Sequence, residues 1–476
     1  MSKTIIIIGA GLAGLSAALQ AAENGCNVKL VSSLPSERAQ SVMAEGGINA
    51  ALNTKDENDS PEEHFTDTIK AACGLADPNA VWGMTQAAPE LVHWLLKLGV
   101  KFNMSGYDDV DLRNFGGQKK KRTAFAQSDT GKQIMTAMID AVRRKEASGM
   151  VERFSHHSFL TLRLCGNICC GCVIRDEYSQ EIVELPGNAV IVASGGMHGL
   201  FGNTTGSLSN TGEVTAELFR LGVPLVNGEM IQYHPTTVEC GGKRMLISEA
   251  ARGEGGRLFA LRNNQPWYFM EEKYPELGNL MPRDITAREI WKVSHESEVF
   301  LDMTEISKEV ISNKLSGLAD DCMTYLHKDI RKEPVPVLPG IHYFMGGILV
   351  DEQHRTSIQN LYAAGECCAQ YHGANRLGGN SLLGALYGGR VAAKSACEQA
   401  DGVVLSCATQ IDIPPASQIS EIKQLNKVMQ ETMGVVRNEN TLLNGIQTVQ
   451  ALTGNLPLLG MAVLKSALAR KESRGA

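Results

Sequence analysis

The sequence lacks the features that mark several classes of protein. It contains no apolar run of about 18 residues, the length that a membrane-spanning helix requires, and no charged and then apolar leader precedes Ile5. Its formal charge of −7 gives no electrostatic reason to expect nucleic acid as a partner. The Cys-x-x-Cys-His motif that attaches a c-type haem is also absent. We therefore expect a cytoplasmic chain that neither enters a membrane directly nor binds nucleic acid.

Cysteine is present, but its pattern does not indicate a disulfide framework or a metal site. Twelve cysteines in 476 residues are too sparse for a disulfide scaffold. Two segments with strand-like alternation, 151–164 and 172–185, flank a local cluster of Cys165, Cys169, Cys170 and Cys172. The cluster does not have the two paired motifs of a zinc or iron–sulfur site. We expect structural thiols here, no bound metal and no second redox centre.

The N-terminus carries the first functional pattern. The four consecutive isoleucines of segment 4–8 are typical of a strand buried on both faces, and segment 15–22 is typical of a helix. The turn between them places glycines at its first, third and sixth positions. Such a turn allows a tight bend, close approach to a pyrophosphate and close helix–strand packing, with the phosphates at the helix N-terminus. The order strand, turn, helix predicts a bound dinucleotide.

The second predicted strand, 27–31, helps to choose between dinucleotides. It ends at Ser32 and Ser33, where NAD-binding units usually carry an acidic residue for the ribose hydroxyls. The serines disfavour NAD and leave FAD open. Further apolar strands are expected at 189–193 and 361–364, so the sequence predicts an α/β fold.

The pattern changes between Gly228 and Pro339, where prolines, short mixed elements and isolated charges replace the alternation of strands and helices. This change predicts a discontinuous nucleotide-binding domain of residues 1–228 and 340–400, interrupted by a substrate domain of residues 229–339. Helical segments are expected at about 415–433 and 438–468, within a C-terminal helical region of residues 401–476.

Six motifs give the sequence a resemblance to a known family. They are AQSVMAEGGINAAL at 39–52, QYHPT at 232–236, SEAARGEGG at 248–256, MPRD at 281–284, HYFMGG at 342–347 and GANRLGGNSLL at 373–383. Over about residues 4–400 their order and type resemble the flavoprotein subunits of the succinate dehydrogenase/fumarate reductase family, whose relatives include L-aspartate oxidase. The resemblance implies a Rossmann-like, glutathione-reductase-like FAD-binding domain, an inserted α+β capping domain and a short C-terminal helical segment.

The resemblance implies FAD that is not covalently attached. Membrane-bound members join FAD to a histidine, and the matching residue here is Gln40, whose amide cannot form that bond. The N-terminus of a helix running to about Ala400 would face the flavin and favour its reduced anion. The residues expected at the cofactor are Gly9, Ala10, Gly11, Leu12, Ala13, Gly14, Ser32, Ser33, Gln40, Ser41, Ala44, Glu45, Gly46, Gly47, Ala193, Ser194, Gly195, Glu213, Glu366, Arg376, Ser381 and Leu382.

The resemblance also implies a dicarboxylate substrate, fumarate or succinate. A dicarboxylate removed from water must meet fixed cations and donors, and arginine suits carboxylates geometrically. Carried over from the family, His342 and Arg376 would hold one carboxylate, and His234 and Ser248 would hold the other. The family usually has threonine where Ser248 stands.

A proton donor is implied in the same way. The family assigns this role to an arginine, here Arg283, which Glu249 and Arg252 would reprotonate. The resemblance alone carries this assignment, because the pKa of arginine normally exceeds about 12. Hydride from reduced FAD and a proton from Arg283 would convert fumarate into succinate.

Other functions remain open from the sequence. L-aspartate oxidase, or another dicarboxylate or enoate reductase of the same fold, is the alternative within the family, although segments 115–117 and 345–347 resemble the succinate/fumarate branch more closely. An electron-transferring flavoprotein without dicarboxylate chemistry is a third alternative. Such a protein would not need the set His234, Arg283, His342 and Arg376.

Electrons must enter from outside the chain. A separate iron–sulfur subunit is the first choice of partner, through which the chain would associate with a membrane; free reduced flavin and NADH-linked donors are the alternatives. The chain ends at the family-like segment 472–476, which continues in relatives, so a short natural variant and a truncated chain would both fit.

Overall fold

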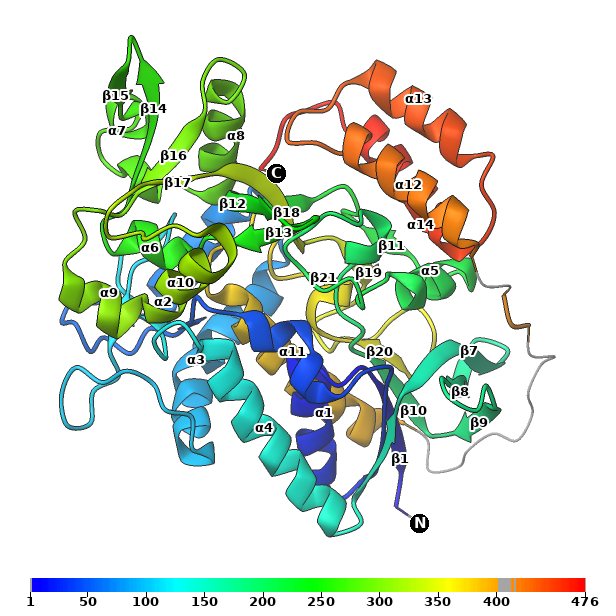
Figure 1. Cartoon of the computed structure of the whole chain (residues 1–476). Coiled ribbons are helices and arrows are strands. Elements are labelled where there is room, and N and C mark those ends of the chain that lie inside the picture. The colour runs from blue at the N-terminus through cyan, green and yellow to red at the C-terminus, as the bar shows by residue number, and fades with distance from the viewer. Residues whose placement is uncertain (1, 401–411, 415–416, 476) are drawn as a thin grey trace.

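The structure is a computed structural model that describes residues 2–400, 412–414 and 417–475 (Figure 1). Its centre is a five-stranded parallel sheet in the order β20, β10, β1, β2, β6. Its strands are β1 (Thr4–Ile8), β2 (Asn27–Ser32), β6 (Val151–Ser155), β10 (Ala189–Val192) and β20 (Leu361–Ala363). The central position of β1 explains its isoleucines, because both of its faces are covered.

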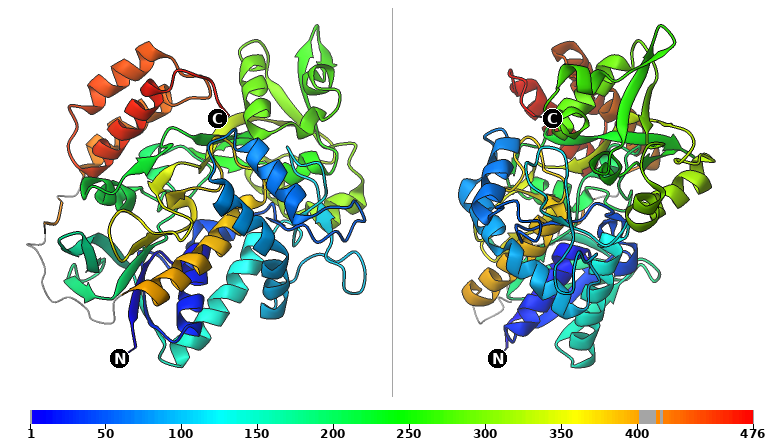
Figure 2. Two further views of the ribbon diagram at one scale, coloured as in Figure 1. Left: turned by 180° about the vertical axis from the view of Figure 1, so that it is seen from behind. Right: turned by 90° about the vertical axis from the view of Figure 1, so that its left-hand side faces the viewer.

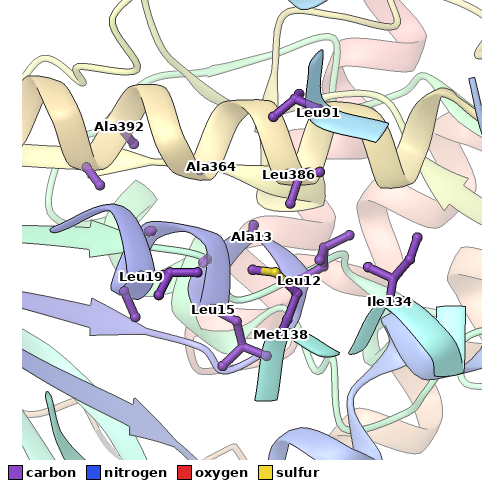
Figure 3. Close-up of a cluster of buried hydrophobic side chains, with 14 of the residues drawn as sticks. Leu12, Ala13, Leu15, Leu19, Leu91, Ile134, Met138, Ala364, Leu386 and Ala392 are labelled. Carbon is purple, nitrogen blue, oxygen red and sulfur yellow. The ribbon is translucent and has the colours of Figure 1, made fainter. Parts of the chain in front are cut away.

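Alternate residues of β1 contribute to two different cores. Ile5 and Ile7 pack beneath a layer of helices, and Figure 3 shows side chains of α1, α3, α4 and α11 gathered in the hydrophobic cluster of this layer. Ile6 and Ile8 pack on the opposite face, against the sheet formed by β7, β8 and β9. The helices of this layer are α1 (Leu12–Glu23), α3 (Pro78–Leu98), α4 (Thr130–Ala147) and α11 (Asn380–Gln399), and α2 (Pro61–Ala71) packs against α3.

Helix α1 begins three residues before the predicted start at Leu15. Gly11 is its N-cap, and the amide of Leu15 donates to the Gly11 carbonyl at 2.9 Å. Gly14 therefore lies inside the first turn, where a Cβ atom would stand 1.8 Å from the carbonyl oxygen of Gly9. The glycine that marks the turn in the sequence thus packs helix against strand, as the motif requires.

The predicted pair of strands at 151–164 and 172–185 is divided differently. The first segment contains β6, which joins the central sheet, and β7 (His157–Cys165), which turns away at His156 with a φ of +59°. The second segment contains the end of β8 (Ile168–Asp176) and most of β9 (Ile182–Pro186). Cys169, Cys170 and Cys172 are therefore buried within β8, where they are free thiols. Burial raises the pKa of Cys169 to about 12 and also raises the pKa of Cys172, so these two thiols resist ionisation.

The segment between Gly228 and Pro339 contributes a separate hydrophobic cluster, at upper left in Figure 1. Two sheets belong to it, β13–β12–β18 and β15–β14–β16–β17. Their strands are β12 (Ile231–Cys240), β13 (Lys243–Leu246), β14 (Arg257–Arg262), β15 (Gln265–Trp267), β16 (Val299–Asp302), β17 (Val335–Pro336) and β18 (Leu338–Phe344). The helices are α6 (Glu249–Gly253), α7 (Phe269–Lys273), α8 (Arg283–Val293), α9 (Lys308–Lys314) and α10 (Ser316–Asp321). The exact division into domains stays a prediction.

Short elements connect these layers. The sheet β3–β5–β4 consists of β3 (Ile48–Asn49), β4 (Leu112–Arg113) and β5 (Thr123–Ala124), and a second small sheet consists of β11 (Leu225–Val226), β19 (Gly347–Leu349) and β21 (Cys368–Ala369). Helix α5 (Glu213–Arg220) follows the glycine turn at Gly212. These short elements place the loops around the cavity described below.

The C-terminal part forms three helices, α12 (Ile419–Thr432), α13 (Glu439–Val449) and α14 (Asn455–Ala469). The predicted helical segment 438–468 is broken at Gly454, whose φ of +106° does not fit a helix. The predicted start near Pro415 lies outside the described residues. The three helices pack on Ile231, Ile341 and Phe344, and Figure 2 shows them far from the N-terminus. Among the described residues, no helix has the length and hydropathy needed to cross a bilayer.

Candidate active site

A cavity of about 1200 Å³ lies between the carboxyl ends of the central strands and the 229–339 segment. It exceeds the range of about 300–1,000 Å³ typical of small-molecule sites. Of the residues predicted to bind cofactor or substrate, all line this cavity except Gly14, which packs behind the turn. Of the predicted proton relay, Arg283 and Glu249 line the cavity and Arg252 does not. Residues scattered over almost 380 positions of the sequence therefore share one space.

The glycine turn forms one end of the cavity. Gly9 has a φ of +113°, and a Cβ atom there would lie 2.2 Å from the carbonyl oxygen of Ala193. The first turn of α1 has no acidic residue and Gly11 supplies no side-chain cap, so its amides are suited to an anion. The buried hydroxyl of Ser32 has no hydrogen-bond partner within the described part of the chain. These features fit the diphosphate and ribose of a dinucleotide.

The 40–47 segment forms the next wall. The amide of Ser207 donates to Oε1 of Gln40, and the amide of Leu12 donates to Oγ of Ser41 at 3.2 Å. Gly47 has a φ of +134°, and a Cβ atom there would lie 2.5 Å from the carbonyl oxygen of Ala124. Glycine at this point therefore lets the 40–47 segment pack closely against β5.

Helix α11 directs its N-terminus at the same cavity. Ser381 and Leu382 line it, and Gly379 is the N-cap with a φ of +85° and no side-chain cap. The first turn of α11 contains no acidic side chain, so its partial positive charge is not neutralised locally. At the same wall, Oε1 of Glu366 accepts from the amide of Phe344 at 3.1 Å and lies 3.6 Å from Nε2 of His198.

Glu213 and Ser248 also line the cavity, and each stands at the start of a helix. Glu213 opens α5, and burial followed by the nearby Glu217 raises its pKa. The hydroxyl of Ser248 accepts from the amide of Ala250 at 3.4 Å and caps α6.

The four residues predicted for the substrate meet at the far end. Arg376 is 3% exposed, with its guanidinium 4.3 Å above the ring of Tyr343. Within the described residues it forms no ion pair, and its Nε atom has no hydrogen-bond partner. Burial, followed by repulsion from Arg283, lowers the pKa of Arg376 to about 9. A buried cation without a counterion is costly and is the clearest sign of an anionic ligand.

Two histidines face each other beside Arg376. The rings of His234 and His342 are 5.1 Å apart, and burial followed by Arg283 lowers the pKa of both well below the ordinary value of 6.5. Nδ1 of His342 lies 2.7 Å from Oγ1 of Thr205, and Nδ1 of His234 lies 3.1 Å from the carbonyl oxygen of Thr236 and 3.3 Å from its amide. When Thr205 donates to Nδ1 of His342, that neutral ring keeps an Nε2–H group for a ligand oxygen.

The predicted proton relay is a continuous buried chain. Nε and Nη2 of Arg283 donate to Oε2 of Glu249 at 2.9 and 2.6 Å, and Nη2 of Arg252 donates to Oε1 at 3.1 Å. The amide of Gly116 also donates to Oε1, at 3.1 Å. Burial acts to raise the pKa of Glu249, but Arg283 and Arg252 outweigh it and lower that pKa. Arg283 lines the cavity, and Arg252 stands behind Glu249.

Gln232 is a site residue to which the sequence analysis gave no role. Its Oε1 accepts from Nη1 of Arg283 at 3.0 Å, and its Nε2 donates to the carbonyl oxygen of Arg376 at 2.7 Å. It therefore connects the relay to the segment that carries the unpaired arginine. Its place two residues before His234 puts both side chains on one face of β12, which is the signal that could have identified it.

Comparison with known proteins agrees with this geometry. The FAD binding domain family matches residues 4–382. The chain is 40% identical over 466 residues to the succinate dehydrogenase flavoprotein subunit of Bacillus subtilis, covering 96% of this chain and 79% of the relative. The chain belongs to the succinate dehydrogenase/fumarate reductase flavoprotein family.

This family also includes proteins with a different named activity. The chain is 35% identical over 484 residues to L-aspartate oxidase of Caulobacter vibrioides, covering 99% of this chain and 91% of the relative. Among solved structures, an Escherichia coli quinol fumarate reductase matches with a TM-score of 0.89 at 26% identity, over 100% of this chain and 90% of that chain. Membership in the family makes the chain an FAD-dependent oxidoreductase with a Rossmann-like FAD-binding domain and a capping domain.

Proposed function

We propose that the chain interconverts fumarate and succinate and works mainly as a fumarate reductase. The unpaired, buried Arg376 at the end of the FAD cavity carries this proposal, because it calls for an anion at that point. The neighbouring Arg283 supplies a second cation, which favours a ligand with two negative charges.

The proposed mechanism divides the work between two ends of the substrate. His342 and Arg376 hold one carboxylate, and His234 and Ser248 hold the other. Holding both ends twists one carboxylate out of conjugation with the double bond and makes the alkene electrophilic. Bound and reduced FAD supplies the hydride.

Proton delivery falls to the relay. Arg283 donates a proton to the carbon next to the one that accepts hydride, and Glu249 and Arg252 return a proton to it. The contacts of 2.6 to 3.1 Å along this chain support the proposal, because proton transfer requires hydrogen-bond distances. The low exposure of all three side chains excludes water that would otherwise compete.

The direction of the reaction follows from the mode of FAD binding. Gln40 stands where a covalently bound FAD would need a histidine, so FAD is held without a covalent bond. A covalent bond raises the potential of the flavin and assists succinate oxidation, and its loss favours fumarate reduction. A separate iron–sulfur subunit supplies electrons and connects the chain to a membrane. The names of relatives as flavoprotein subunits support such a partner.

A parallel assay of the purified, FAD-loaded protein tests the proposal. We expect fumarate reduction by a low-potential dye to be faster than succinate oxidation, and no peroxide to form from L-aspartate. Peroxide formation that depends on aspartate would assign the chain to L-aspartate oxidase, the second candidate, which the 35% identical relative supports. If the protein turns over neither fumarate and succinate nor L-aspartate, both functions are rejected.

A further inference from the structure

Residues 376–381, called the strap below, connect the unpaired arginine to the N-terminus of α11. Gly378 and Gly379 lie in its middle, and each has a polar side chain pressed against it. A Cβ atom on Gly378 would lie 2.5 Å from Oε2 of Glu249, and one on Gly379 would lie 2.2 Å from Oδ1 of Asn49. The strap is therefore held between the relay and Asn49. Any displacement would move Arg376 and the end of α11 together.

Asn49 fixes the middle of the strap through its side chain and its backbone. Its Nδ2 donates to the carbonyl oxygen of Gly378 at 2.8 Å and to Oδ1 of Asn380 at 2.7 Å. Its own amide donates to the carbonyl oxygen of Gly379 at 3.2 Å, and its Oδ1 accepts from Thr123 at 2.6 Å. Asn49 is fully buried, so water cannot replace these bonds.

His64, on α2, supports the strap from further away. Its Nε2 lies 2.9 Å from Oδ1 of Asn380, while Nδ2 of Asn380 donates to Oγ1 of Thr68 at 3.0 Å. Because Oδ1 of Asn380 can only accept, Nε2 of His64 must carry the hydrogen. Burial, followed by the charge of Arg122, lowers the pKa of His64 to about 3, so the ring is neutral.

Arg122 completes the support. Its guanidinium is fully buried and pairs with Asp59 at 2.8 Å and Asp67 at 2.9 Å. It therefore brings a compensated charge beneath α2. The arrangement is expensive to bury and specifies one position for α2 against the strap.

We propose that Asn49 and His64 are positioning residues for the reaction. Through the Gly378 carbonyl and the Asn380 side chain they hold Arg376, the relay and the flavin-facing end of α11 in one arrangement. Neither residue lies in the set predicted for FAD or substrate, and His64 does not line the cavity. The kinetic part of this proposal rests on the proposed fumarate chemistry, whereas the effect on the flavin rests on family membership alone.

The test compares His64→Leu, which removes the donor, with His64→Gln, which keeps an N–H donor near the Nε2 position. A displacement of about 1 Å lowers turnover by up to about 100-fold. We expect His64→Leu to lower kcat for fumarate about 10- to 100-fold with a smaller change in KM, and to lower the flavin midpoint potential as the end of α11 loosens. His64→Gln should restore most of both. Asn49→Leu should reproduce the defect.

His354→Leu is the matched control. His354 is equally buried and is hydrogen-bonded to the carbonyl oxygen of Ala363 and to Tyr371, but it does not contact the strap. We expect it to lower Tm while leaving kcat and the flavin potential near those of the wild type.

Hydrogen exchange supplies a readout that requires neither activity nor FAD. In the apoprotein, His64→Leu should accelerate exchange at strap amides relative to both wild type and His354→Leu. If the potential, kcat and strap exchange of His64→Leu match those of the control, the proposal is wrong. It is equally wrong if His64→Gln folds but restores nothing. If the wild type turns over no dicarboxylate, the proposed function fails, while the potential and exchange still decide the role of the strap.

Discussion

At the scale of single residues, the site is defined by charges that the protein leaves incompletely balanced. Arg376 has no carboxylate partner among the described residues, whereas Arg283 and Arg252 share one, Glu249. Burial, followed by the charge of Arg283, lowers the pKa of Arg376, and the two neighbouring arginines lower the pKa of Glu249 although burial acts to raise it. Such perturbed pKa values are typical of functional sites.

Arg283 should be essential for reduction and dispensable for FAD. Replacing it with alanine removes the proposed proton donor, and proton transfer by a positioned group contributes about 100- to 10,000-fold to rate. We expect Arg283→Ala to lose at least about 100-fold in kcat for fumarate while the flavin spectrum and FAD content stay normal. Arg262→Ala provides the control, because Arg262 is exposed and stacks on Trp267 at 3.4 Å. Retained activity in Arg283→Ala would reject the assigned donor.

Glu45 should make the stability of the protein depend on pH. Burial, followed by the charge of Asp321, raises its pKa from 4.5 to about 8, and its Oε2 has no partner within the described residues. The protonated form is therefore favoured by folding, so its contribution is complete below about pH 4.5 and is lost as pH rises through about 8.

The corresponding measurement is Tm between pH 5 and 9. Glu45→Gln should flatten the fall of Tm across this interval, since glutamine cannot ionise. Glu90→Gln, on the exposed face of α3, should leave the slope as it is in the wild type. An unchanged slope in Glu45→Gln would contradict the assignment.

At the scale of elements, the strand–turn–helix at the N-terminus was predictable because its signal is local. The isoleucines of β1 and the glycine spacing lie within eleven consecutive residues, and both reflect packing at the centre of a sheet. The hairpin boundary at His156 was not predictable, because a left-handed residue other than glycine leaves no pattern in hydrophobicity. The break before α14 is different, because it lies at Gly454, a residue type that interrupts helices and could have marked the break in the sequence.

Side-chain partners were predictable only where the family resemblance supplied them. The two aspartates that pair with Arg122 precede it by more than 50 residues, so the residues next to it in the sequence gave no hint of them. Gln232 was missed because its two partners come from α8 and from the strap, which meet only in the folded chain. The roles assigned to His234, Ser248, His342 and Arg376 stay predictions.

The turn before α1 yields a prediction at this scale. A methyl group on Gly9 would collide with the backbone of Ala193, so Gly9→Ala should abolish FAD binding or prevent folding. Gly25→Ala is the control: Gly25 also has a positive φ, +79°, but no atom lies within 4 Å of its added Cβ. The control should cost about 1–2 kcal/mol from backbone strain and keep its FAD. FAD absorbance of the two purified variants measures how much FAD each retains. Normal FAD binding by Gly9→Ala would refute the prediction.

At the scale of the whole molecule, loops at the ends of the central strands line one part of the cavity, and the 229–339 segment supplies most of the residues predicted for the chemistry. That segment contains most of the residues predicted for substrate and proton transfer: His234, Ser248, Glu249, Arg252 and Arg283. Gln40 lies in the part of the chain that precedes the segment. This division predicts that FAD is removable without breaking a covalent bond.

Acid precipitation of the purified protein tests that prediction, because it separates free flavin from flavin attached to the chain. We expect the yellow flavin to remain in the supernatant, where its fluorescence matches that of free FAD. Because the amide of Gln40 is not nucleophilic, Gln40→Ala should release FAD in the same way. Flavin that stays with the precipitated wild-type chain would show a covalent attachment elsewhere.

The unpaired Arg376 has a consequence beyond catalysis. An empty site leaves two buried guanidinium groups repelling each other, and a ligand with two negative charges relieves that repulsion. Occupancy and folding are thereby thermodynamically linked, because a ligand that binds only the folded chain stabilises it. With the proposed dicarboxylate as substrate, its supply in the cell would then set how long the protein survives as well as how fast it works.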